Sequence, residues 1–151
     1  MNISAVVSIV VRFLHIGSVA GLVGGALYAR LAVVPALNAL PAAERAQSAR
    51  TAQEKFRGIL FTLLLLVVAS GLYNGFGPGA PVHGRQWQIW FGIKMLFVLH
   101  ILATAILWAT SPYGDIAVEG KGKRRLLSLV ISGFITIFIG DYLRYLTSNG
   151  L

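Results

Sequence analysis

The sequence predicts an all-α protein, an integral membrane bundle of four helices, and three observations carry this prediction. Of the 151 residues, 56% are hydrophobic and only 12% are charged, against roughly 25% charged residues in soluble domains. The apolar residues form blocks, each longer than the roughly 18 to 20 residues that a helix needs to cross a bilayer. Four such blocks use up the chain, so we expect residues 1–151 to form a single transmembrane domain.

The first two spans differ in what surrounds them. We expect span one over residues 4–34, ended by Pro35, because proline breaks the hydrogen-bond ladder of a helix. Span two is expected over 56–76. The polar stretch before it, about 41–55, is rich in Ala, Gln, Glu and Arg, which are good helix formers. Pro41 suits a first helical turn, so span two should be the end of a longer helix with a polar extension.

The third and fourth spans are expected over residues 87–108 and 126–146, and the basic residues between spans set the orientation. Short loops rich in Lys and Arg stay in the cytoplasm. One side of the membrane would carry nine basic residues: Arg30, Arg45, Arg50, Lys55, Arg57, Lys121, Lys123, Arg124 and Arg125. The other side would carry three: Arg12, Arg85 and Arg144. This bias puts both odd-numbered loops in the cytoplasm and predicts a multi-pass membrane protein with both termini on the outer side.

Composition excludes several classes of function. The chain has no cysteine, which rules out disulfides, thiolate metal sites and iron–sulfur clusters. Five acidic residues give little support to a calcium or magnesium site or to hydrolysis by paired carboxylates. Topology explains the net charge of +8, so we expect no nucleic-acid partner. Histidine is the strong metal-binding side chain that remains.

Two histidines, His15 and His100, lie inside predicted spans, where an imidazole is costly unless it has a partner. At about 1.5 Å per residue, His15 lies roughly 16 Å and His100 roughly 20 Å from the outer ends of their spans. Similar depth predicts a shared metal, with both rings as axial ligands of one haem iron. Two alternatives stay open. Each ring forms a hydrogen bond across helices, or it has a role in handling a proton or a substrate.

Cations also fall in the outer halves of the spans. Arg12 and Lys94 could snorkel to the interface, or they could pair with carboxylates of a buried ligand, such as haem propionates. Lys94 has no acidic residue three or four positions away, so we take it as a candidate catalytic residue. Asp141 and Arg144 are three apart on one helix, a spacing that favours a local ion pair.

Small residues line two of the spans. Gly17, Gly21, Gly24 and Gly25 give span one a spacing of four that lets another helix, or a flat ligand, approach closely. Gly21 is therefore a candidate haem contact, with plain helix packing as the alternative. Span four has a ladder of Ser128, Ser132, Thr136 and Gly140, which we interpret as a packing stripe. His83 lies in a glycine- and proline-rich loop, where we expect it to be solvated.

The order of these features resembles that of the small four-helix bacterial membrane proteins of the HemJ type, which are proposed protoporphyrinogen oxidases, and their copper-resistance D relatives. The matching segments are Phe13-Leu14-His15-Ile16, Lys55-Phe56-Arg57, residues 94–100 from Lys94 to His100, and Lys123-Arg124-Arg125-Leu126-Leu127. The resemblance implies a haem b held by His15, with His100 as a second candidate, and an essential lysine at Lys94. It also implies oxidation of a tetrapyrrole, with electrons passed to the membrane, and a place in the bacterial cytoplasmic (inner) membrane with both termini on the periplasmic side.

Three functions follow as hypotheses. The leading one is a b-type haem protein in redox chemistry or electron transfer, an oxidoreductase whose partners are membrane lipid and a quinone or another membrane redox partner. The second is a copper or cation transporter, although two Met and three His are few for copper. The third is a non-catalytic accessory subunit, in a homo-oligomer or a larger complex, whose stability depends on Gly21 and Ser132 more than on His15.

Overall fold

The computed structural model describes residues 3–77, 84–111 and 121–149, and every regular element in these ranges is helical. The elements are α1 (Ile3–Tyr28), the π-helix η1 (Ala29–Val33), α2 (Val34–Asn38), α3 (Ala42–Phe76), α4 (Arg85–Thr110) and α6 (Lys121–Ser148). Four helical segments are long and apolar enough to cross a membrane: Ile3–Asn38, Ala42–Phe76, Arg85–Thr110 and Gly122–Ser148. The prediction of an all-α chain with four long apolar helices is confirmed.

The first helical segment is longer than predicted, because it continues past Pro35 to Asn38. Pro35 stands in the first turn of α2, directly after the π-helical residues Ala29–Val33. Proline lacks an N–H, and its ring clashes with the preceding turn of a regular α-helix. A π-turn is wider and changes the hydrogen-bond ladder locally, so the chain passes the proline without ending the helix.

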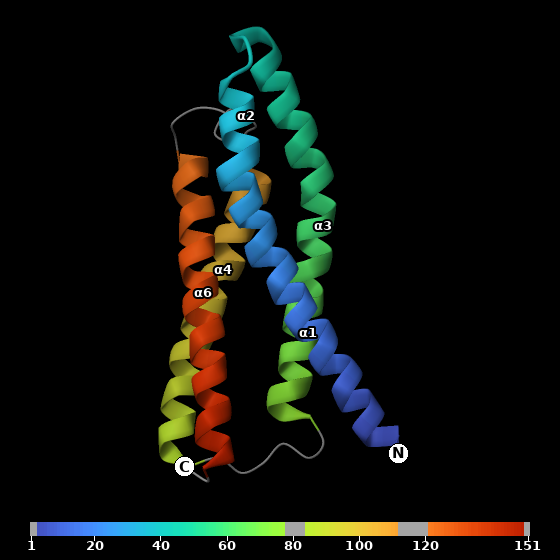
Figure 1. The fold of residues 1–151 in the computed structure, drawn as a ribbon, viewed down its shortest axis with the longest axis vertical. Coiled ribbons are helices and arrows are strands. Elements are labelled where there is room, and N and C mark those ends of the chain that lie inside the picture. The colour runs from blue at the N-terminus through green and yellow to red at the C-terminus, as the bar shows by residue number, and fades with distance from the viewer. Residues whose placement is uncertain (1–2, 78–83, 112–120, 150–151) are drawn as a thin grey trace.

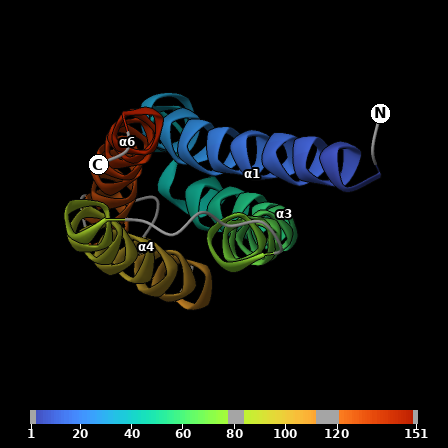
Figure 2. The same cartoon turned by 90° about the horizontal axis from the view of Figure 1, so that it is seen from below.

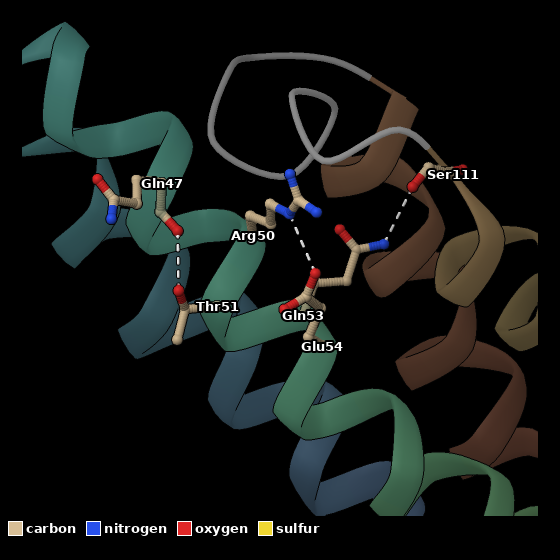
Figure 3. Close-up of polar contacts among 6 residues, drawn as sticks. All are labelled: Gln47, Arg50, Thr51, Gln53, Glu54 and Ser111. Carbon is tan, nitrogen blue, oxygen red and sulfur yellow. Dashed lines mark hydrogen bonds and ion pairs between the residues drawn. The ribbon is translucent and has the colours of Figure 1, made fainter.

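α3 is one helix of 35 residues that joins the polar extension to the apolar span. Its start is fixed by Arg45, whose Nη2 donates to the carbonyls of Asn38 at 3.1 Å and Leu40 at 2.9 Å. These bonds satisfy carbonyls at and just after the end of α2, where the helix offers no partner. The exposed face of the extension carries an ion pair between Arg50 and Glu54 at 3.0 Å (Figure 3).

The helices form two antiparallel pairs, α1 with α3 and α4 with α6, which meet where α1 packs on α6 (Figures 1 and 2). α6 is the most enclosed, with 39% of its most apolar window buried against 17% for each of the others. Both termini lie at the same end of the bundle, here named the terminal end (Figure 1). The first part of α1 leans away from the other helices, and all residues from 3 to 14 except Val11 are exposed.

The buried interior has two apolar clusters with a polar layer between them. The larger cluster lies away from the terminal end and includes Trp108 of α4 and Val130 of α6, while the smaller one gathers around Ile139 of α6. Between Val130 and Ile139, α6 buries Ser132 and Thr136. Other polar residues buried in the bundle are Ser18, Gln53, Ser70 and Thr104. The candidate site lies next to this layer on the side of the terminal end, where Lys94 of α4 meets Gly140 of α6.

Candidate functional site

Two adjacent residues of α3, Ser70 and Gly71, position the side chain of His15 of α1. Its Nδ1 lies 3.0 Å from the hydroxyl oxygen of Ser70, which is buried. The neighbouring Gly71 leaves room for the ring, because a Cβ at that position would stand 3.2 Å from His15 Cε1. A hydroxyl and a missing side chain, adjacent in the sequence of α3, together position the imidazole.

The hydrogen bonds of Ser70 determine which nitrogen of His15 carries the proton. The Ser70 hydroxyl donates to the carbonyl of Leu66, one turn earlier in α3. A serine hydroxyl has a single hydrogen, so toward His15 its oxygen acts as the acceptor and Nδ1–H is the donor. In the neutral ring Nε2 is then unprotonated, and its lone pair is available to a metal ion or a proton donor.

Lys94 of α4 approaches the same region from the opposite helix pair. Its amine fits against Gly140 of α6, where a Cβ would lie 3.4 Å from Nζ. The side chain is half-buried and forms no ion pair with any residue that the structure describes. The contact between Val23 of α1 and Gly133 of α6 sets a common level. His15 lies eight residues and Gly140 seven residues from this contact toward the terminal end, so His15 and Lys94 lie at a similar depth in the bundle.

His100 of α4 has polar partners of its own. Its Nε2 lies 2.8 Å from the hydroxyl of Ser128 on α6 and 3.5 Å from that of Thr104, one turn along α4. The ring is exposed on the side of the bundle. This arrangement matches the alternative in which an intramembrane histidine forms a hydrogen bond across helices.

The structure does not bring His15 and His100 together. Val23 of α1 touches α6 at Gly133, where a Cβ would lie 2.5 Å from Val23 Cγ2, so these two residues share a level. His15 is eight residues from that level toward the terminal end, and Ser128, the partner of His100, is five residues from it in the other direction. At about 1.5 Å per residue the two imidazoles lie roughly 15 to 20 Å apart along the bundle. The depths predicted from the sequence hold only if both spans are straight and begin at the same level. In the structure α1 leans outward, and the first helical segment extends to Asn38.

The remaining candidate residues lie apart from the two histidines. Arg12 is exposed, and no described residue forms a hydrogen bond or ion pair with its guanidinium. Gly21 faces Leu63 of α3, where a Cβ would lie 3.3 Å from the leucine side chain, so its contact is helix packing. Asp141 and Arg144 are both exposed and, contrary to the prediction, form no ion pair with each other.

A metal site built from protein ligands alone receives no support. No group of three or more His, Cys, Asp or Glu side chains lies together in the ranges that the structure describes. His83, predicted to be solvated, lies outside the described residues. One histidine with a free nitrogen suits instead a metal that arrives with most of its own ligands, as in a haem.

Sequence reasoning missed part of this site. Ser70 and Gly71 were not singled out, although they are a polar and a small residue inside an otherwise apolar run, which was the available signal. Ser128 and Gly140 were predicted to be packing residues, and they contact His100 and Lys94. No family model, curated protein or solved structure matches the chain, so the HemJ-type resemblance rests on the residue segments quoted above.

Proposed function

We propose that this chain is a multi-pass protein of the bacterial cytoplasmic membrane with both termini outside. The four apolar helices support the membrane assignment. The basic residues Arg45, Arg50 and Lys55 belong to the end of the bundle opposite the termini, as do Lys123 and Arg124. Positive charge marks the cytoplasmic side, which places the terminal end, and the site around His15 and Lys94, in the outer half.

We propose further that the protein binds a haem b and that a single histidine, His15, would hold it. The observation that carries this proposal is the bond from His15 Nδ1 to Ser70, which leaves Nε2 free. Histidines that ligate metals usually donate their other N–H to an oxygen in this way, which fixes the orientation of the ring. His100 is not included as a second ligand, because it lies roughly 15 to 20 Å from His15 along the bundle.

Lys94 would hold a carboxylate of the haem or of a substrate. A half-buried ammonium with no anionic neighbour among the described residues is costly in a membrane unless a ligand supplies the charge. Arg12 is three residues from His15 on α1 and, being exposed, can reach a second carboxylate near the interface. Haem propionates are anions of this kind, and charge-assisted hydrogen bonds to them are strong.

The protein's own contribution is to bind, orient and shield the group. The haem would supply reversible electron chemistry at its iron. Ser70 and Gly71 fix the His15 ring. The HemJ-type resemblance favours a reduced tetrapyrrole as the electron donor, whose carboxylates Lys94 would bind, and a membrane quinone as the acceptor.

An absorption spectrum of the purified protein, expressed with a full haem supply, tests the proposal. We expect a Soret band that shifts on reduction with dithionite, and a pyridine haemochrome of b type. His15→Ala should remove the band, and His100→Ala should keep it. A colourless preparation, or loss of haem in the His100 variant with retention in the His15 variant, would overturn the proposal.

A further inference from the structure

One face of α6 carries a row of exposed residues whose spacing alternates between four and three. The row, here named the seam, consists of Leu127, Ile131, Phe134, Phe138, Asp141, Tyr145 and Ser148. This alternation gives a repeat of about 3.5 residues, which keeps one stripe of a helix facing a second helix along its length. Figure 2 shows α6 at the edge of the bundle, between α1 and α4. No helix that the structure describes covers the seam, because all of its residues are exposed.

The seam contains a carboxylate at a depth where lipid solvates it poorly. α6 has 28 residues, so it is about 42 Å long and exceeds the hydrocarbon core of a bilayer by about 12 Å. When α6 is centred on the bilayer, Asp141, seven residues from its end, lies about 4 Å inside the hydrocarbon. Side chains tilt toward the N-terminus of their helix, which for Asp141 is away from the nearer interface. This short side chain therefore cannot snorkel as Lys or Arg does.

Asp141 and Arg144 both lack a partner in their own chain. Each is exposed, and neither forms an ion pair with any residue in the described ranges. Arg144 lies beside the seam, three residues closer to the terminal end than Asp141. Two seams that meet would bring two carboxylates together, which repel each other unless cations lie between them. Two carboxylates and two guanidiniums form a neutral cluster, and a guanidinium has enough donors to serve both carboxylates.

We propose that the seam is the interface between two copies of this chain, which pair in parallel through α6. A twofold axis along the membrane normal brings the same face of both chains together, so Asp141 and Arg144 of one copy meet those of the other. Helices in lipid associate through packing and polar contacts rather than through a hydrophobic force. The neutral charge cluster is therefore what favours a second copy over lipid as the occupant of this face.

The aromatic rings beside the cluster are already held in place. Tyr145 stacks on Tyr142, with ring centroids 6.3 Å apart, and Tyr142 meets Trp90 of α4 edge to face at 5.1 Å. Tyr145 nevertheless remains 60% exposed, and Phe138 is 73% exposed. A surface that is ordered before association loses less side-chain freedom when it binds, so this part of the seam is prepared for a partner.

Disulfide cross-linking tests the interface, because the chain has no cysteine of its own. Ile131→Cys and Ser148→Cys place single thiols 17 residues apart along the seam. Oxidation of the full chain in membranes should link both variants into dimers, because facing residues of a parallel pair come within the roughly 4 to 7 Å between Cα atoms that a disulfide spans. Ser8→Cys, an exposed serine on α1 near the terminal end, is the control and should link at least tenfold more slowly. Absence of dimers, or equal rates in seam and control variants, overturns the proposal.

Charge reversal tests the cluster. In the Ser148→Cys chain, Asp141→Arg would bring four cations together, so we expect the dimer yield to fall at least tenfold. Adding Arg144→Asp gives two charges of each sign and should restore the dimer. Arg85→Asp, which reverses an exposed charge of α4 away from the seam, should leave the yield unchanged. An unchanged yield in Asp141→Arg, or no restoration by Arg144→Asp, overturns the role of the charges. None of these readouts requires haem, so this inference and the proposed haem site can fail independently.

Discussion

Lys94 on α4 lies against Gly140 on α6, where a Cβ would be in van der Waals contact with the lysine Nζ at 3.4 Å. A branched side chain at position 140 would extend past this contact into the position of the amine. This contact positions the ammonium of Lys94 inside the bundle, so the side chain does not snorkel to the interface.

The first prediction tests whether Gly140 positions Lys94. Gly140→Val places branched carbons where the ammonium lies, so we expect it to act as Lys94→Ala does. At the proposed haem site, a nearby cation would disfavour oxidised haem, which carries more positive charge, so both variants should lower the reduction potential or the haem content. Spectroelectrochemical titration measures the potential, and the haemochrome assay measures haem content per chain.

The double variant sharpens this test. If both substitutions disturb the same interaction, Gly140→Val combined with Lys94→Ala should be no worse than Lys94→Ala alone. Gly92→Val is the matched control, because a Cβ at position 92 on α4 would meet nothing within 4 Å. Fully additive effects would contradict a shared mechanism.

The second prediction concerns the hydrogen bond between His15 and Ser70. Ser70→Ala removes the acceptor for Nδ1–H while keeping the proposed ligand, and loss of such a partner typically weakens metal binding about 10- to 100-fold. Haem titration into the purified apoprotein measures this affinity. Ser128→Ala is the control, since Ser128 contacts His100 and should leave haem affinity unchanged. Equal losses in the two variants would argue against a site with one histidine.

The four helices could be predicted from sequence because their signal is local. A run of apolar residues specifies a span without reference to the rest of the chain, and helical propensity over 41–55 revealed the extension of α3. The relative levels of His15 and His100 depend on helix tilt and on the π-turn before Pro35. These are properties of packing between helices, and spacing within one helix carries no information about them.

The contacts of small residues show the same limit. Gly21 and Gly25 meet Leu63 and Phe56 of α3, whereas a Cβ at Gly17 or Gly24 would meet nothing within 4 Å. The regular spacing predicted close packing, but the rotation of α1 about its axis decides which glycines take part. That rotation is set by the partner helix, so the sequence of α1 alone could not choose among the four.

The third prediction concerns the hydrogen bonds that join Gln53 of α3 to α4, at the end of the bundle opposite the termini. Gln53→Leu removes the two hydrogen bonds to the carbonyls of Trp108 and Ser111 at the end of α4. Leaving a buried carbonyl without its donor costs about 1 to 3 kcal/mol. We expect a lower midpoint of thermal unfolding in detergent for Gln53→Leu. Gln47→Leu, at an exposed position on the same helix, should unfold at the wild-type temperature, and a similar loss in both would contradict the role assigned to the amide.

The fourth prediction tests the contact that joins the two helix pairs. A Cβ at Gly133 of α6 would stand 2.5 Å from Val23 Cγ2 on α1, closer than van der Waals contact allows. Valine is branched at Cβ and stiff at χ1, so it cannot turn aside, and Gly133→Ala should force α1 and α6 apart at a cost of about 1 to 3 kcal/mol.

Gly24→Ala is the matched control, because its Cβ would meet nothing within 4 Å and alanine favours the helix by about 0.5 to 1 kcal/mol. Unfolding of both variants by increasing SDS should show opposite shifts, destabilised for Gly133→Ala and neutral or stabilised for Gly24→Ala. A stable Gly133→Ala protein would mean that α1 does not lie against α6 at this level, and the separation inferred between His15 and His100 would lose its reference point.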